Sequence, residues 1–117
     1  MSVTRKVVDG GSGRPQPEVV NRLVQAILRV ARPERILLFG SAARGEMGPE
    51  SDIDVMVVVS EGTPRRSTAQ AIHRELLDVP AAVDVIVTTP SALERHRDNA
   101  GLIYASALRD AETVYAA

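Results

Sequence analysis

The chain has 117 residues, a hydrophobic fraction of 44%, and a net charge of −1 from 14 basic and 15 acidic residues. This length indicates one globular domain, and the balanced charge gives no sign of a nucleic-acid or membrane partner. Aromatic residues make up 3% of the chain, so a stacking surface for RNA is not expected. Cysteine is absent, which excludes disulfides, thiolate metal sites and a cysteine nucleophile. No apolar segment has the length of a membrane span and no signal peptide is visible, so we expect a cytoplasmic protein.

The first half of the chain is expected to form a lead-in, a helix and two strands. Residues 1–17 are predicted to be a flexible lead-in, because the stretch DGGSGRPQP is rich in Gly, Pro and Ser. Residues 18–117 would then form the domain. A helix is predicted over 18–31, and strands over 35–39 and 53–59. The helix has an apolar stripe with spacings of three or four, made of Val20, Leu23, Val24, Ile27 and Leu28.

The second half alternates in the same way. A helix is predicted over 66–78, where Ala69, Ile72, Leu76 and Val79 share a face, and a strand over 82–88. A helical region follows from 90 to about 110, and the sequence TVYA near the end predicts a short edge strand. Strands that alternate with helices indicate an α+β (α/β-like) fold, with a small mixed sheet of three to four strands and helices packed on it.

Two aspartates interrupt the apolar pattern where the second strand begins. The stretch LLFGSAARGEMGPESDIDVMVVV, residues 37–59, contains Gly40-Ser41 and then Asp52 and Asp54. Alternation along a strand places Asp52 and Asp54 on the same face. Two like charges there are unfavourable unless a positive group lies near them.

A third carboxylate, Asp84, stands among Val and Ile at the start of the third strand. The intervening residues 60–81 contain a helix long enough for a crossover between parallel strands. A parallel pair would bring Asp84 beside Asp52 and Asp54, whereas an antiparallel pair would leave it in an apolar core. We therefore expect the second and third strands to be parallel, and the first and second to be antiparallel.

Carboxylates grouped in this way are the ligands that Mg²⁺ prefers, together with substrate phosphates. Two Mg²⁺ ions that share aspartates can stabilise both oxygens of a phosphoryl or nucleotidyl displacement. The turn at Gly40-Ser41 leads into a predicted helix start, so its backbone N–H groups and the Ser41 hydroxyl can bind a phosphate. Arg44, one helical turn further on, can contact the same phosphates. The predicted metal ligands are Asp52, Asp54 and Asp84, and the predicted phosphate-binding residues are Gly40, Ser41 and Arg44.

These motifs resemble the signature of the DNA polymerase beta-like nucleotidyltransferase superfamily, a Gly-Ser turn followed after about ten residues by Asp-x-Asp on a strand. Arg44-Gly45 and the Ser-Asp-Ile-Asp stretch at 51–54 are similar to its small prokaryotic branch, the minimal nucleotidyltransferases. The resemblance covers residues 18–116. It implies Mg²⁺ and ATP as cofactors, a catalytic role for Asp52, Asp54 and Asp84, and a base function for Asp84 toward an acceptor hydroxyl.

The resemblance also implies a partner chain, because larger members of the superfamily hold the acceptor with an additional helical region. Minimal nucleotidyltransferases act as antitoxins beside HEPN-type toxins, by transferring AMP to a toxin tyrosine, by direct binding, or by both. Transfer of AMP to such a toxin is the leading hypothesis. A contact-only antitoxin and an antibiotic-type enzyme acting on a small molecule are the alternatives. Homo- and hetero-oligomers are both compatible with these hypotheses.

Other polar residues have simpler interpretations. His73 and His96 lie on predicted helices without a second ligand four positions away, so surface positions are favoured over a metal site. Arg65 and Arg66 are expected in a solvated loop after the second strand. Tyr104 and Tyr115 are interpreted as packing residues and not as acceptors.

Overall fold

The structure, a computed structural model, describes residues 13–48, 51–96 and 109–117. The elements within these ranges are α1 (Pro17–Val30), β1 (Arg35–Phe39), α2 (Gly40–Arg44), β2 (Ile53–Val58), α3 (Arg65–Glu75), the 3₁₀ helix η2 (Leu76–Asp78), β3 (Val83–Thr88), α4 (Pro90–His96) and β4 (Glu112–Ala116). None of the helices in the described ranges is long and apolar enough to cross a membrane.

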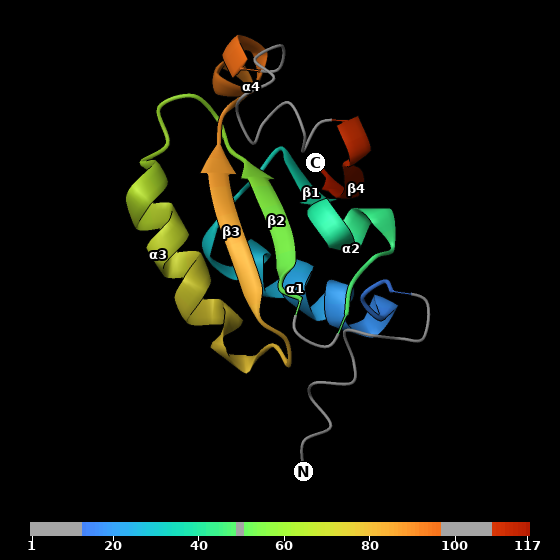
Figure 1. Cartoon of the computed structure of the whole chain (residues 1–117). Coiled ribbons are helices and arrows are strands. Elements are labelled where there is room, and N and C mark those ends of the chain that lie inside the picture. The colour runs from blue at the N-terminus through green and yellow to red at the C-terminus, as the bar shows by residue number, and fades with distance from the viewer. Residues whose placement is uncertain (1–12, 49–50, 97–108) are drawn as a thin grey trace.

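The four strands form one mixed sheet in the order β3-β2-β1-β4. β2 and β3 are parallel and lie side by side, while β1 is antiparallel to both β2 and β4 (Figure 1). The expected parallel and antiparallel pairings are therefore confirmed, and α3 makes the crossover between β2 and β3. The fold is the predicted mixed α/β arrangement, with β4 as the edge strand expected from TVYA.

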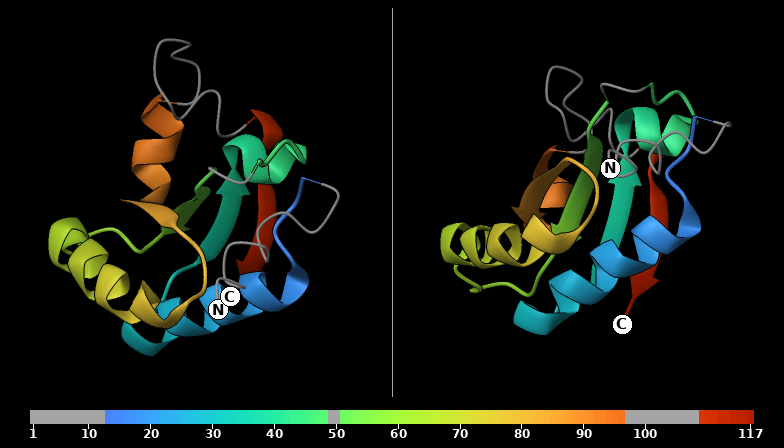
Figure 2. Two further views of the ribbon diagram at one scale, coloured as in Figure 1. Left: turned by 60° about the horizontal axis from the view of Figure 1, so that its bottom comes forward. Right: turned by 90° about the horizontal axis from the view of Figure 1, so that it is seen from below.

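The two faces of the sheet have different covers. α1 and α3 pack together on one face, as the turned views show (Figure 2). Ile53, Val55 and Val57 of β2 belong to the large core cluster on this face, and all three are fully buried. The opposite face has a smaller cluster made of Leu37, Phe39, Met56, Val58 and Leu93. Because residues of a strand alternate between faces, Asp54 shares this second face with Met56 and Val58.

α1 forms because its apolar residues make one stripe that the sheet covers. Its fully or nearly buried residues are Val19, Leu23, Val24, Ala26 and Ile27. The predicted stripe had Val20 and Leu28 in place of Val19 and Ala26, but those two side chains are only partly buried. Pro17 occupies the first turn, where the lack of an N–H costs nothing.

Other sequence expectations have mixed outcomes. The interpretation of Arg65 and Arg66 as loop residues is wrong, because they are the first two residues of α3, directly after Pro64 at the N-cap. The predicted helix over 66–78 divides into α3 and η2. Tyr115 is half-buried and packs against the large core cluster, as expected. Residues 1–12 of the predicted lead-in, Tyr104 and the greater part of the helical region beyond His96 lie outside the described residues.

Candidate active site

Gly40 links the end of β1 to the start of α2 and lies directly against Asp54. Its φ is +66°, in the left-handed region that a side chain rarely adopts. A Cβ built on Gly40 would overlap Oδ2 of Asp54. The backbone conformation therefore favours glycine at this position, and a Cβ there would also displace the Asp54 carboxylate.

Asp54 lies between the other two parts of the predicted site. Its strand partner on one side is Phe39, the last residue of β1, and on the other side is Asp84 of β3. Paired residues on adjacent strands point to the same face, so the side chains of Asp54 and Asp84 are neighbours. The part of the sequence prediction that places Asp84 beside Asp54 is confirmed.

The Asp54 carboxyl is in an unfavourable environment for a negative charge. Partial burial raises its pKa above the ordinary value, and the negative charges of Asp84 and Asp52 raise it further. Arg44 acts in the opposite direction but is the smallest of these influences. Asp54 is half-buried, whereas Asp52 and Asp84 are exposed. The site therefore concentrates negative charge that Arg44 does not balance.

Arg44 is held by carboxylates. Its Nε donates to Glu46 Oε1 at 2.9 Å, and its Nη1 lies 4.0 Å from Asp110 Oδ2. The hydrogen bond to Glu46 raises the pKa of the guanidinium above its ordinary value. Sequence reasoning identified Arg44 as a candidate phosphate contact but missed these two partners, of which Asp110 is distant in the chain.

Hydrogen bonds join several of the described residues between the turn and the aspartates. Ser51 Oγ accepts from the Gly48 N–H at 3.0 Å, and the Ser51 N–H donates to the Gly48 carbonyl at 3.1 Å. The Ser41 carbonyl accepts from the Glu46 N–H at 2.9 Å. The Ser41 hydroxyl itself makes no hydrogen bond to another of the described residues.

Within the described ranges, no three His, Cys, Asp or Glu side chains are grouped closely enough to form a ready-made metal site. Asp54 and Asp84 are direct strand neighbours, and Asp52 is near enough to raise the pKa of Asp54. His73 is exposed on α3, in keeping with the predicted surface position, and His96 has no described side chain.

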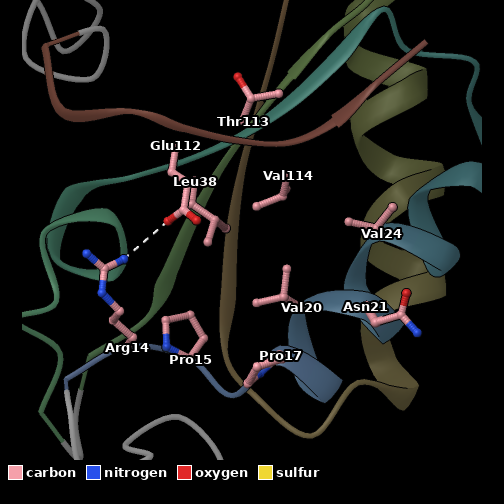
Figure 3. Close-up of a pocket in the computed structure, with 10 residues that line it drawn as sticks. All are labelled: Arg14, Pro15, Pro17, Val20, Asn21, Val24, Leu38, Glu112, Thr113 and Val114. Carbon is pink, nitrogen blue, oxygen red and sulfur yellow. Dashed lines mark hydrogen bonds and ion pairs between the residues drawn. The ribbon is translucent and has the colours of Figure 1, made fainter.

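A separate cavity of about 470 Å³ lies at the other face of the sheet, between α1, β4 and the residues before α1. Val20 and Val24 of α1 and Leu38 and Val114 of the strands line its interior, as Figure 3 shows. Leu38 belongs to the large core cluster, on the face away from Asp54. This cavity, which Arg14 and Glu112 line together with the apolar residues, is therefore distinct from the carboxylate site.

Comparisons with known proteins agree with the geometry. The family model for the nucleotidyltransferase domain matches residues 20–111. The fold is similar to that of a "putative nucleotidyltransferase" from Sulfolobus solfataricus, with a TM-score of 0.61 and 17% sequence identity. The alignment covers 97% of this chain and 87% of that one. No curated protein matches the chain. At 17% identity the structural likeness shows the fold alone, whereas the family match assigns the class.

The chain belongs to the nucleotidyltransferase domain family. The matched range includes the Gly40 turn, the Asp-x-Asp pair and Asp84, and so contains the whole candidate site.

Proposed function

We propose that the chain transfers AMP from ATP to a hydroxyl acceptor in a Mg²⁺-dependent reaction. The observation that carries this proposal is the position of Asp54, with the Gly40 turn against its carboxylate and Asp84 as its strand neighbour. This arrangement supports the proposal because a bound triphosphate at the turn would lie directly beside the carboxylates.

The donor set fits a hard divalent cation. Partial burial raises the pKa of Asp54, two nearby carboxylates raise it further, and a cation between the carboxylates would remove their repulsion. Mg²⁺ keeps water and substrate phosphates among its ligands, so a closed protein cage is not needed. Asp52, Asp54 and Asp84 would hold two Mg²⁺ ions, which when bound neutralise charge on the carboxylates and the phosphates.

The residues of the chain would then have distinct tasks. The backbone at Gly40 and the hydroxyl of Ser41 would bind and orient the triphosphate, with Arg44 as an additional cation. Asp84, exposed on the outer strand, would accept the proton of the acceptor hydroxyl. The acceptor oxygen forms a bond to the α-phosphorus, the bond from that phosphorus to the β-phosphate oxygen breaks, and pyrophosphate leaves.

Binding of the donor is the first test, because it needs no knowledge of the acceptor. Calorimetric titration with ATP and MgCl₂ should give saturable heat for the wild type. The Asp52→Asn/Asp54→Asn variant should bind at least about tenfold more weakly, since two charged ligands are removed. Equal affinity of the variant, or affinity that persists unchanged in excess EDTA, would remove the basis for the assigned site.

The acceptor that we propose is a tyrosine of a HEPN-type toxin, so that the chain acts as an antitoxin. The resemblance to minimal nucleotidyltransferases supports this choice, and the exposure of Asp52 and Asp84 leaves the site open to a macromolecular hydroxyl. Coexpression with the toxin should add one or more AMP units to the toxin's intact mass. The Asp54→Asn variant should add none. Neutralisation of the toxin without added mass would favour the contact-only antitoxin.

A further inference from the structure

Gly13 and Arg14 precede α1 in the sequence and contact the loop after α2 and the start of β4. The Gly13 carbonyl accepts a hydrogen bond from the Met47 N–H at 2.8 Å. Arg14 Nη1 donates to Glu112 Oε1 at 3.2 Å, and Figure 3 shows this pair at the edge of the cavity. We call Gly13 and Arg14 the N-terminal clasp. Its contacts join segments that are far apart in the sequence.

The clasp requires glycine at its first position. Gly13 has a φ of +75°, and a Cβ built on it would overlap the carbonyl oxygen of Gly45. Gly45 is itself the left-handed residue that ends α2, with a φ of +72°. Two glycines therefore allow the backbone before α1 to lie directly against the backbone after α2.

The clasp contacts a loop that leads to the aspartates. Met47 is 5% exposed, with its side chain in the large core cluster and its N–H bonded to the clasp. Gly48 follows and is bonded to Ser51 in both directions, and Asp52 comes next. A displacement at Met47 would pass to Asp52 through these hydrogen bonds.

The second clasp residue extends the support to β4. Glu112, the ion-pair partner of Arg14, is the first residue of β4 and the strand neighbour of Leu38. Two residues earlier, Asp110 lies 4.0 Å from Arg44 of α2. The clasp, the start of β4, α2 and the loop after it therefore form a closed ring of contacts, and Arg44 is the member of this ring that acts on the charge of Asp54.

We propose that Gly13 and Arg14 are positioning residues that hold the loop after α2, and thereby set Asp52 relative to the Gly40 turn. The expected effect of these two residues on nucleotide binding rests on the proposed function. The loop support itself is a property of the fold and can be measured without substrate.

Amide hydrogen exchange by NMR tests the loop support. The Gly13→Ala variant should exchange at least about tenfold faster at Met47 and at Ser51, because the clasp must move away from Gly45. Gly62→Ala is the matched control, since Gly62 has a φ of +88° but a Cβ there would meet no described atom within 4 Å. It should leave both amides unchanged. Unchanged exchange at Ser51 in Gly13→Ala would overturn the positioning role.

Titration with ATP and MgCl₂ tests whether the clasp affects nucleotide binding. Gly13→Ala should raise the dissociation constant about tenfold or more, and Arg14→Gln about two- to fivefold, while Gly62→Ala should leave it unchanged. Arg29→Gln is the matched control for the second variant, because Arg29 has a comparable exposed ion pair with Glu75 at 3.1 Å, away from the site. Faster exchange in Gly13→Ala with wild-type affinity would refute the positioning role.

A wild type that binds no ATP would refute the proposed function and with it the predicted effect on affinity. Exchange at Met47 and Ser51 would still decide whether the clasp supports the loop. The failure of one proposal is therefore distinguishable from the failure of the other.

Discussion

Replacing Gly40 by alanine should destabilise the fold by more than the strained backbone conformation alone would. A side chain at a φ of +66° costs about 1–2 kcal/mol. The new Cβ would also overlap Asp54 Oδ2, so the carboxylate must leave its rotamer or the turn must shift, at about 1–3 kcal/mol more. We expect Gly40→Ala to lower the free energy of unfolding by about 2–5 kcal/mol in total.

A double-mutant cycle separates these two contributions. In an Asp54→Ala background the overlapping oxygen is absent, so Gly40→Ala should cost only the conformational part. Gly62→Ala, with a φ of +88° and no neighbouring atom, gives an independent value for that part. Urea unfolding of the four proteins of the cycle should show a coupling of about 1–3 kcal/mol between positions 40 and 54. If the destabilisation of the double variant equals the sum of the two single variants to within about 0.5 kcal/mol, close packing of the turn on Asp54 is refuted.

Three further predictions concern charge and packing. The pKa of Asp54 is higher in the folded than in the unfolded protein. Asp54 therefore contributes favourably to stability below pH 3.8, the ordinary pKa of aspartate, and this contribution is lost as the pH rises through the folded pKa. Asp54→Asn should therefore unfold at higher urea concentration than the wild type at neutral pH, and this advantage should shrink toward pH 3.8. Glu61 accepts a hydrogen bond from the Ser91 N–H at 2.8 Å, and this bond lowers the pKa of Glu61. The contribution of Glu61 to stability is therefore present above pH 4.5, the ordinary pKa of glutamate, and is lost as the pH falls through the folded pKa. Glu61→Gln should accordingly lower the thermal midpoint at neutral pH and not in strong acid; a deficit that persists in acid would contradict this. Ile27→Ala, at a fully buried position, should cost about 2–5 kcal/mol in urea unfolding, whereas Leu77→Ala, at a position 82% exposed, should cost under about 0.5 kcal/mol.

The sheet and the carboxylate group could be predicted from sequence because both depend on strand periodicity. Asp54 and Asp84 stand out as charged residues at the starts of otherwise apolar strands. A crossover of the right length makes those strands parallel and so brings the two residues into register. The Gly-Ser turn was visible because glycine is the residue that tolerates a left-handed φ.

The contacts around the site could not be predicted, because they join residues with no shared local pattern. Gly13 stands in a Gly- and Pro-rich stretch typical of a linker, and nothing nearby in the sequence indicates its contact with Gly45. The approach of Asp110 to Arg44 likewise depends on the path of the chain into β4. For Arg65 a local signal existed, since Pro64 directly before it favours a helix start, but the basic pair was interpreted as solvated loop.

The strand order has a consequence for synthesis of the protein. β4 is the last element along the chain, yet it pairs with β1, which is made some seventy residues earlier. Until β4 leaves the ribosome, one edge of β1 has unpaired backbone groups, and Arg14 lacks its partner Glu112. A nascent or truncated chain that ends before residue 112 can therefore contain all three aspartates but lacks β4, the strand that pairs with β1. β1 therefore gains its second strand partner only after residue 112 and those that follow it have been synthesised.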